Sequence, residues 1–437
     1  MKTSESDVSN KRLLVISYFY PPANSLPSQR VSKFTKYLYR WGWEPHVLTI
    51  GPQKSLINDM PFEIPEKFIH ATGRWDFDRF VAYAFEHREK NKTGKIARPT
   101  NVKRIAEFLR GFGQKTIIPD GKIGWYPFAV RYGRELIEKL SPSIILAVGG
   151  PYTGFLIASK LSAQYGIPWV ADILDPWADN YSIRKFPPFS FLNARMEKST
   201  LSTCSKIVVV TEPWAAQLRE KYGDRIVEVV CNAYDDEDFA LENEEMQRDQ
   251  KITIVYTGYL YKRQLPEVFF VSLRRFLDDC PEAQVAVEFY GPMYPSVFFH
   301  YVKKYRLEDF IFYCGQVSYM EAIHHQKKAD VLLLFTWGAK GVLLAKALSY
   351  LGAGRPILSV GPENDTTADF IKNNRLGLAS NESSRIREFL AETFIEKKRF
   401  GRVSPIEGEA CLKSYFTYRN QAKRLSAVLE EVAAAGA

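Results

Sequence analysis

The basic residues best placed to do chemistry follow an apolar run in the C-terminal half of the chain. Residues 252–257 (ITIVYT) lead directly into Gly258, and Lys262 and Arg263 follow within five residues. A glycine just past a strand lets a ligand approach the backbone. The two cations could neutralise a diphosphate, the guanidinium in bidentate fashion. An ordinary turn with two solvated bases explains the same residues equally well.

A second candidate anion site lies farther along the same half. The segment Lys340–Leu351 predicts a helix that contains Lys346. Backbone N–H groups at the start of a helix carry a partial positive charge and bind anions, which points to Gly341 and Val342. A helix start beside a second basic loop would suit a nucleotide diphosphate.

Two residues between a predicted strand and the next helix are candidates for contact with a nucleobase. Gln316 and Val317 follow the apolar run that ends at Cys314. Their backbone groups could hold the edge of a base. A plain helix N-cap at Ser318 fits the same residues, because serine is a favoured capping residue.

The N-terminal half offers two aspartates and an arginine. Asp172 and Asp175 lie at the end of the predicted strand Trp169–Leu174. They could orient an acceptor hydroxyl or assist its deprotonation; alternatively, Asp175 caps the turn that follows. Arg30, at the start of the first predicted helix, could reach a phosphate or form a surface salt bridge.

The sequence contains no motif for metal binding, disulfide formation or nucleophilic catalysis. The six histidines show no ligand spacing and the five cysteines contain no CxxC pair, so no metal site and no disulfide framework are predicted. The sequence also lacks a GxSxG nucleophile elbow and a Walker phosphate loop. We expect the cysteines to be free thiols in a reducing cytosol.

The elements that must position these residues alternate between apolar runs of strand length and amphipathic stretches of helix length. The runs are continuously apolar, which indicates strands covered on both faces of a parallel, doubly wound α/β sheet. The predicted strands are Arg12–Ser17, Pro45–Ile50, Ile144–Val148, Trp169–Leu174, Lys206–Thr211, Ile252–Thr257, Gln284–Tyr290, Phe310–Cys314, Asp330–Phe335 and Pro356–Val360.

The strand–helix pattern occurs twice, so we predict two Rossmann-like domains. The first is 1–235, with a basic insertion at about 52–125, and the charged stretch 236–251 is the linker. The second is 252–405, and 406–437 forms one C-terminal helix that returns to the first domain. Such folds bind ligands at the C-terminal ends of their strands, so we expect a ligand in a cleft between the domains.

Composition and charge fit this interpretation. Of 437 residues, 46% are hydrophobic and 25% charged, which is typical of globular protein. The net charge of +9 is partly local, because residues 86–115 hold nine Lys or Arg against three Glu. This basic segment could lie on an anionic membrane or be a solvated face. No apolar run predicts a membrane span, the polar N-terminus does not predict a secretory leader, and no motif indicates nucleic acid.

A set of short motifs, in this order and spacing, resembles the bacterial family-4-like glycosyltransferases of GT-B fold along nearly the whole chain. Each fragment is weak alone, and the order carries the resemblance. The fragments are Tyr18–Pro22, Gly42–Pro45, Pro168–Asp172, Asp175–Trp177, Asn232–Asp235, Tyr256–Gly258, Gly315–Ser318, Ala329–Leu334 and Lys346–Leu358.

The resemblance implies a nucleotide-sugar donor in the C-terminal domain and a lipid-linked or polysaccharide acceptor on the N-terminal domain. Transfer in this family is usually retaining and metal-independent, with no permanently bound cofactor. The implied enzyme is cytoplasmic and peripheral at the inner face of the cell membrane. The implied site residues are Gly258, Lys262, Arg263, Gln316, Val317, Gly341, Val342, Lys346 and Ser349 for the donor, Arg30, Gly150 and Pro151 for the acceptor, and Asp172 and Asp175 for catalysis.

Departures from the family pattern keep two alternatives open. Ser349 stands where the family has the glutamate that commonly binds the ribose hydroxyls, and Leu174 and Ala233 replace the usual arginine and glycine. These departures would fit a non-catalytic GT-B scaffold in polysaccharide assembly. A nucleotide-sugar epimerase of the same fold is the other alternative, although we find no clear set of acid and base residues for it.

Overall fold

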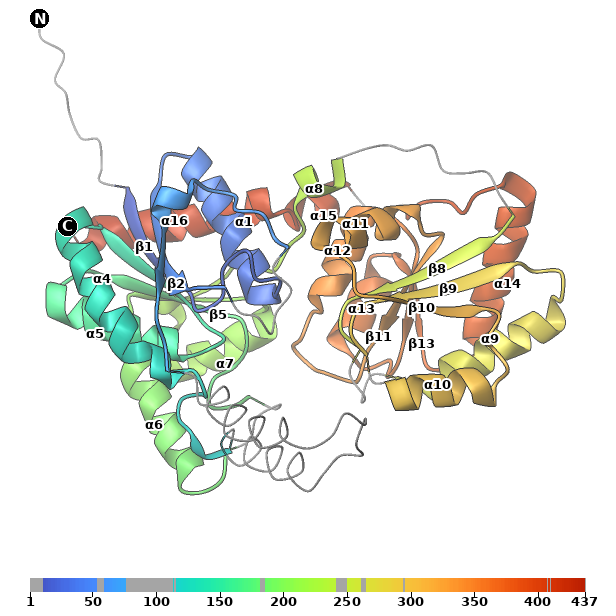
Figure 1. Ribbon diagram of the computed structural model, residues 1–437, viewed down its shortest axis with the longest axis horizontal. Helices are drawn as coiled ribbons and strands as arrows, with labels where there is room; N and C mark the ends of the chain where they lie inside the picture. Colours follow the sequence, from blue (N-terminus) through green and yellow to red (C-terminus); the bar gives the residue numbers. More distant parts are fainter. Residues whose placement is uncertain are drawn as a thin grey trace, which may run out of the picture. The chain divides into compact units, whose positions relative to one another are not determined.

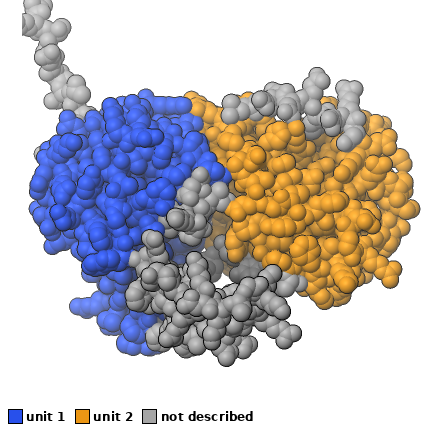
Figure 2. Space-filling model, in the orientation of Figure 1, with its two compact units in different colours: residues 1–230, 422–437 blue, residues 231–421 orange. Residues whose placement is uncertain are grey.

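The computed structural model describes residues 11–52, 59–75, 113, 115–180, 185–240, 250–260, 265–293, 295–406, 408 and 410–436. The chain forms two compact units, which Figure 2 shows in different colours. Unit 1 comprises residues 1–230 and 422–437, and unit 2 comprises residues 231–421. The chain therefore passes between the units twice.

Unit 1 is built on a parallel sheet of seven strands among the described residues, in the order β3-β2-β1-β4-β5-β6-β7 (Figure 1). Its strands are β1 (Arg12–Ile16), β2 (Glu44–Ile50), β3 (Ile69–Thr72), β4 (Ile144–Val148), β5 (Trp169–Ile173), β6 (Lys206–Val209) and β7 (Val227–Val229). Its helices include α1 (Leu26–Arg40), α4 (Tyr126–Leu140), α5 (Thr153–Tyr165), α6 (Phe189–Leu201) and α7 (Glu212–Tyr222), with short 3-10 turns at Glu66–Phe68, Ile123–Trp125 and Asp224–Ile226.

Unit 2 has a parallel sheet of six strands in its described part, in the order β10-β9-β8-β11-β12-β13. The strands are β8 (Ile252–Thr257), β9 (Val285–Tyr290), β10 (Ile311–Gly315), β11 (Val331–Phe335), β12 (Ile357–Val360) and β13 (Gly377–Ser380). The helices are α8 (Asp236–Ala240), α9 (Glu267–Asp279), α10 (Pro295–Lys304), α11 (Tyr319–Lys328), α12 (Ala345–Ala353), α13 (Thr366–Asn373), α14 (Ser383–Phe400) and α15 (Ala410–Tyr415); α16 (Tyr418–Gly436) begins in unit 2 and ends in unit 1.

The central strands are buried along their whole length, as continuous apolar runs require. Every residue of β4, β5 and β11 is buried, because helices cover both faces of a doubly wound sheet. Both sheets are parallel, so the C-terminal ends of neighbouring strands meet at one edge of each unit. Gly258, after β8, and Asp172, near the end of β5, lie at these edges.

The segments expected to form the linker and the last helix differ from the prediction. Residues 236–240 of the expected linker form α8 inside unit 2, and 241–249 lie outside the described residues. The C-terminal stretch is two helices, α15 and α16, because the backbone at Phe416–Thr417 pairs with another segment. The Tyr234 N–H donates to the Phe416 carbonyl at 3.0 Å, and the Tyr418 N–H donates to the Tyr234 carbonyl at 2.8 Å.

None of the helices in the described ranges combines the length and the apolar character needed to cross a bilayer.

Candidate functional site

Three glycines end three neighbouring strands at the C-terminal edge of the unit 2 sheet. Gly258 follows β8, Gly291 follows β9 and Gly315 ends β10, and all three have positive φ angles, of 98°, 120° and 79°. The Gly258 N–H donates to the Tyr290 carbonyl at 2.8 Å. A Cβ atom on Gly291 would lie 2.5 Å from the Gly258 carbonyl oxygen. The strand ends are therefore packed tightly and expose backbone to an incoming ligand.

Lys346 of α12 extends across this edge, over Gly258. Its Nζ donates to the Tyr256 hydroxyl at 2.5 Å and to the Tyr259 carbonyl at 3.2 Å. The same nitrogen lies 4.0 Å from the centroid of the Tyr256 ring. A Cβ atom on Gly258 would be 2.8 Å from Cε of Lys346. The absence of a side chain at Gly258 is thus what leaves room for the lysine.

The electrostatic setting of Lys346 favours an anionic ligand. Among the described residues no carboxylate pairs with its ammonium, and both of its acceptors are neutral oxygens. Burial lowers the pKa of Lys346 to about 7, because the surroundings disfavour the charged form. An anion placed beside the ammonium would reverse that effect and would itself be held by charge-assisted hydrogen bonds.

The helix that carries Lys346 begins later than predicted. It starts at Ala345, and Gly341 lies in the preceding loop with φ +77°. The Gly341 N–H donates to Thr366 Oγ1 at 2.8 Å, and the Val342 carbonyl accepts from Thr367 Oγ1 at 3.2 Å. The amide predicted to bind an anion at Gly341 is therefore occupied by the start of α13. The N-terminus of α12 lies instead beside Lys346 and has no side-chain cap.

Asp365 explains why this loop is not helical, and the sequence analysis did not single it out. Its Oδ2 accepts from the amides of Gly338 and Ala339 at 3.0 and 2.9 Å, and its Oδ1 accepts from the Thr367 N–H at 2.8 Å. Asp365 is 2% exposed. A buried carboxylate that satisfies three amides fixes the loop in a non-helical conformation.

Ser349 lies three residues after Lys346 on α12 and belongs to a chain of hydrogen bonds. Its hydroxyl donates to Gln326 Oε1 at 2.7 Å, and Gln326 Nε2 donates to Thr257 Oγ1 at 2.9 Å. Residues three apart on a helix share a face, so Ser349 and Lys346 lie on the same side of α12. The two predicted donor residues are thus brought together, with the serine hydroxyl half-buried.

The remaining donor-side predictions have different outcomes. Ser318 caps α11: its Oγ accepts from the Glu321 N–H at 3.3 Å, and Glu321 Oε2 accepts from the Ser318 N–H at 2.8 Å. This capping box confirms the plain N-cap interpretation, while Gln316 is exposed and Val317 half-buried before it. Lys262 and Arg263 lie outside the described residues, as does most of the basic segment 86–115.

Arg30 and Asp172 form a buried ion pair in unit 1, which neither expectation for Arg30 anticipated. Arg30 Nε donates to Asp172 Oδ2 at 2.9 Å, and Nη2 donates to Oδ1 at 2.8 Å and to the Val230 carbonyl at 2.8 Å. Both side chains are 0% exposed. The arginine therefore lies beneath the surface instead of forming a surface salt bridge, and it occupies both oxygens of Asp172.

Asp175 differs from Asp172 in being exposed, just past the end of β5. The turn that it was expected to cap is held by other groups. The Tyr152 hydroxyl donates to the Pro176 carbonyl at 2.7 Å, and the Tyr152 and Trp177 rings stack at 5.2 Å. No hydrogen bond to the Asp175 carboxylate occurs within the described part of the chain, so this group is the more accessible of the two candidate aspartates.

Gly150 and Pro151 lie between β4 and α5, where a second residue that the sequence analysis missed is found. The Asp120 carboxylate accepts from the Thr153 N–H at 2.9 Å, from Thr153 Oγ1 at 2.9 Å and from the Lys122 N–H at 2.8 Å. Desolvation raises the pKa of Asp120. Asp120 accepts from the amide two residues ahead, which is the turn that aspartate often forms before glycine. The Asp-Gly-Lys sequence could therefore have indicated this turn.

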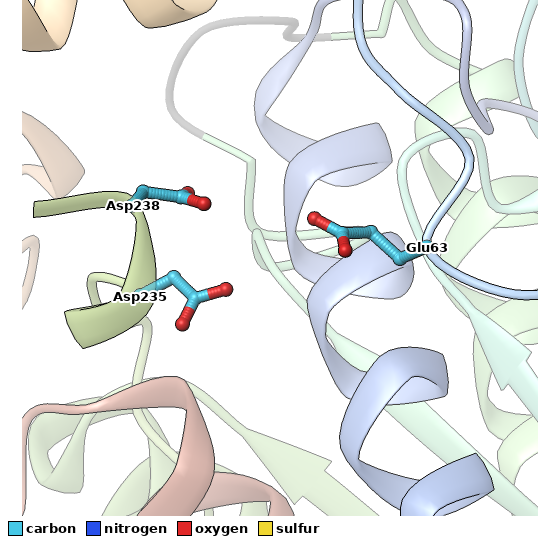
Figure 3. A group of neighbouring side chains, drawn as sticks. All are labelled: Glu63, Asp235 and Asp238. Atoms are coloured by element: carbon cyan, nitrogen blue, oxygen red, sulfur yellow. The ribbon is translucent and has the colours of Figure 1, made fainter. Parts of the chain in front are cut away.

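Three further carboxylates, drawn in Figure 3, are accounted for within their own units. In unit 1, Glu63 accepts from Lys33 Nζ at 2.5 Å. In unit 2, Asp238 accepts from the Tyr319 hydroxyl at 2.8 Å, and Asp235 accepts from the Glu237 N–H at 3.3 Å. We assign no metal to this group, because its members come from different units.

The two parallel sheets with their covering helices define a class, the two-domain α/β proteins of GT-B fold. Residues 29–238 match the sequence model of the family described as Glycosyltransferase Family 4. The resemblance to family-4-like glycosyltransferases that the motifs indicated is thus confirmed. No protein of curated function matches the sequence.

Solved structures with the same fold cover nearly the whole chain. HepE from Anabaena, in complex with UDP, has a TM-score of 0.62 at 12% identity, over 96% of this chain and 100% of that one. Sucrose-phosphate synthase from Thermosynechococcus elongatus has a TM-score of 0.61 at 12% identity, over 97% and 99%. WaaG, a glycosyltransferase involved in lipopolysaccharide biosynthesis, has a TM-score of 0.54 at 10% identity, over 95% of each chain.

Proposed function

We propose that this protein is a glycosyltransferase that moves a sugar from a nucleotide-sugar donor to a lipid-linked or polysaccharide acceptor. Unit 2 binds the donor and unit 1 the acceptor. The observation that carries the proposal is Lys346, a half-buried lysine at the strand ends whose ammonium has no carboxylate partner in the described part of unit 2. The HepE structures with UDP and UDP-glucose support a nucleotide-sugar donor.

In the proposed donor complex, cations of unit 2 surround the diphosphate. Lys346 binds a phosphate oxygen, helped by the uncapped N-terminus of α12, and Lys262 and Arg263 add charge. Positive charge aimed at the departing diphosphate stabilises the transition state of the transfer. These cations would make a metal ion unnecessary, as the family resemblance implies. The resemblance also implies that transfer would be retaining. The backbone at Gln316 and Val317 borders the base.

In the proposed acceptor complex, Asp175 orients the attacking hydroxyl or accepts its proton. Gly150 and Pro151 line the acceptor side at the end of the neighbouring strand β4. Arg30 and Asp172 act from below the surface: their ion pair fixes the end of β5, which leads into Asp175. Asp172 is then a positioning residue, since its two oxygens are already bound to Arg30.

One observation favours a second candidate, a non-catalytic scaffold. The hydroxyl of Ser349, which the resemblance assigns to the ribose, donates to Gln326. A ribose hydroxyl would have to compete with that bond, and serine lacks the charge of the glutamate that it replaces. A protein that had lost donor binding would tolerate this arrangement.

The proposed protein is cytoplasmic and peripheral at the inner face of the cell membrane. The basic segment 86–115 supports this proposal through its charge, because anionic lipids attract clusters of Lys and Arg near the bilayer surface.

Nucleotide binding tests the proposal directly. The full chain is titrated with UDP, GDP and ADP, and Kd is measured by calorimetry beside the shift in Tm. We expect one nucleotide to bind and Lys346→Ala to weaken it at least tenfold. Lys303→Ala, an exposed lysine of α10, is the control and should bind as the wild type does. No binding by any nucleotide would favour the scaffold.

A further inference from the structure

Helix α6 of unit 1 turns two large apolar side chains outward in its first turn, where Phe191 is 70% exposed and Leu192 is 43% exposed. Its buried face combines Leu201, 0% exposed, with polar side chains. Asn193, 3% exposed, accepts from Trp177 Nε1 at 3.1 Å, and Glu197 is 4% exposed. Large apolar residues of a surface helix normally face the core. An outward apolar residue of this size indicates a surface that another phase or partner covers.

The aromatic surface extends back to Phe186, three residues before the helix begins. Phe186 is 45% exposed, and its N–H donates to the Lys115 carbonyl at 3.2 Å. Lys115 Nζ lies 4.6 Å from the centroid of the Phe186 ring. Lys185 Nζ donates to the Ile117 carbonyl at 2.6 Å. These contacts tie the start of α6 to residues 115–117, so the exposed ring is held in place.

The charge of this surface has one sign. Arg195 and Lys198 follow Phe191 at the i+4 and i+7 positions, which places all three along one face of α6. Lys115 and Lys185 lie at the helix start. In the described residues of 113–117 and 185–201 the only acid is Glu197, which points inward and accepts from the Tyr222 hydroxyl at 3.0 Å.

We propose that this surface, which we call the α6 surface and define as Phe186, Phe191, Leu192, Arg195 and Lys198, binds the face of a membrane that contains anionic lipid. The aromatic and aliphatic side chains insert among the lipid headgroups, and the basic residues pair with phosphate above them. The inference deepens the proposed membrane association, and it rests on the proposed function only for the expectation of a lipid-linked acceptor.

A bilayer fits this surface better than a macromolecular partner does. Phe191 projects from the first turn of α6 with most of its ring exposed, and Leu192 and Phe186 are also exposed. Exposed apolar side chains beside Arg195 and Lys198, in a stretch whose one described acid points inward, match an interface with anionic headgroups, where both kinds of group are accommodated together.

Vesicle binding by the full chain tests the proposal. Flotation is measured with vesicles of phosphatidylcholine alone and with 30% phosphatidylglycerol, at about 0.1 M and 0.5 M salt, where screening differs strongly. We expect the wild type to bind only the anionic vesicles and to release at high salt. The double variant F191S/L192S, and separately R195E/K198E, should lower the partition coefficient at least tenfold. Phe299→Ser, an exposed phenylalanine of α10, should leave it unchanged.

Nucleotide Kd and sedimentation are measured on the same variants. Nucleotide Kd should be unaffected by F191S/L192S, so failure of this inference and failure of the proposed donor site are distinguishable. If the wild type and both double variants bind vesicles equally, the α6 surface is excluded and any membrane contact lies elsewhere. Absence of wild-type binding overturns the proposal, and so does a wild-type dimer in sedimentation that F191S/L192S converts to monomer, which would assign the surface to a second copy.

Discussion

The Cε atom of Lys346 lies 2.8 Å from the position that a Cβ atom of residue 258 would take, which is closer than a real Cβ atom allows. Gly258 also has a φ of +98°, which side-chain-bearing residues rarely adopt. The backbone of β8 and the reach of the lysine are therefore coupled at one residue. A side chain at position 258 must therefore shift the end of the Lys346 side chain.

Gly258→Ala should consequently damage nucleotide binding more than it damages the fold. We expect Kd for the preferred nucleoside diphosphate to rise about tenfold, because one charge-assisted hydrogen bond is worth roughly that factor. Gly354→Ala is the matched control, since Gly354 has φ +71° but open space around its Cβ position. Both variants should lose about 1–2 kcal/mol of unfolding free energy from strain. Equal Kd values for the two variants would show that Gly258 does not contribute to nucleotide binding.

The lowered pKa of Lys346, about 7, predicts a pH-dependent donor affinity. In the empty protein the ammonium loses its proton as pH rises through 7, whereas the bound diphosphate holds the proton on. Nucleotide affinity should therefore fall by about tenfold per pH unit above neutrality, as one coupled proton requires. Lys346→Arg should flatten the profile between pH 7 and 9, because guanidinium stays charged throughout. A wild-type profile that is already flat would contradict the assignment.

The Arg30–Asp172 pair predicts a large effect on stability. Asp172→Asn leaves the guanidinium buried without its counter-charge, which typically costs about 3–5 kcal/mol of unfolding free energy. Asp278→Asn removes one partner of the exposed pair with Arg274 and should change it by less than about 1 kcal/mol. Urea unfolding with tryptophan fluorescence measures both. If Asp172→Asn unfolds like Asp278→Asn, the pair does not hold β5.

His70 predicts a loss of stability in acid. His46 Nδ1 and His70 Nε2 lie 3.0 Å apart, and desolvation together with repulsion from His46 lowers the pKa of His70 to about 4. An unfolded histidine titrates near 6.5, so between pH 6.5 and 4 the unfolded chain binds more protons and stability falls as pH falls. For a partly exposed group we expect about 1–2 kcal/mol over that window.

The measurement is urea unfolding at a series of pH values from 7 to 4. His70→Gln should reduce the slope of stability against pH, whereas His300→Gln, an exposed histidine of α10, should leave it unchanged. Identical slopes for wild type and His70→Gln would show that other groups control acid unfolding.

The strands and site residues that the sequence predicted correctly are those marked by neighbouring residues in the chain. The central strands were found because their apolar runs are continuous, whereas the short edge strands β3, β7 and β13 carry too few residues to stand out. Gly258 and Lys346 were found because each belongs to a motif. What the sequence could not reveal was the 2.8 Å relation between them, which depends on β8 and α12 meeting in space.

The errors have the same origin. Residues 340–344 were expected to be helical, but the hydroxyls of Thr366 and Thr367, about 25 positions later, accept from the amides of Gly341 and Leu344. Arg30 was expected at the surface because arginines usually are. Its partner lies 142 residues away, so only the tertiary structure shows that the pair is buried.

Replacing Ser349 best separates the two candidate functions, because the enzyme needs a group here that binds the ribose and the scaffold does not. Ser349→Glu would restore the carboxylate that the family pattern has at this position, on the same face of α12 as Lys346. If the donor ribose lies there, Kd for the nucleoside diphosphate should fall by about three- to tenfold, because a carboxylate is a stronger acceptor for hydroxyl groups than serine. Ser349→Ala is the control: it removes only the bond to Gln326 and should change Kd less than twofold. An unchanged Kd for Ser349→Glu, with the fold intact by circular dichroism, would place the ribose elsewhere.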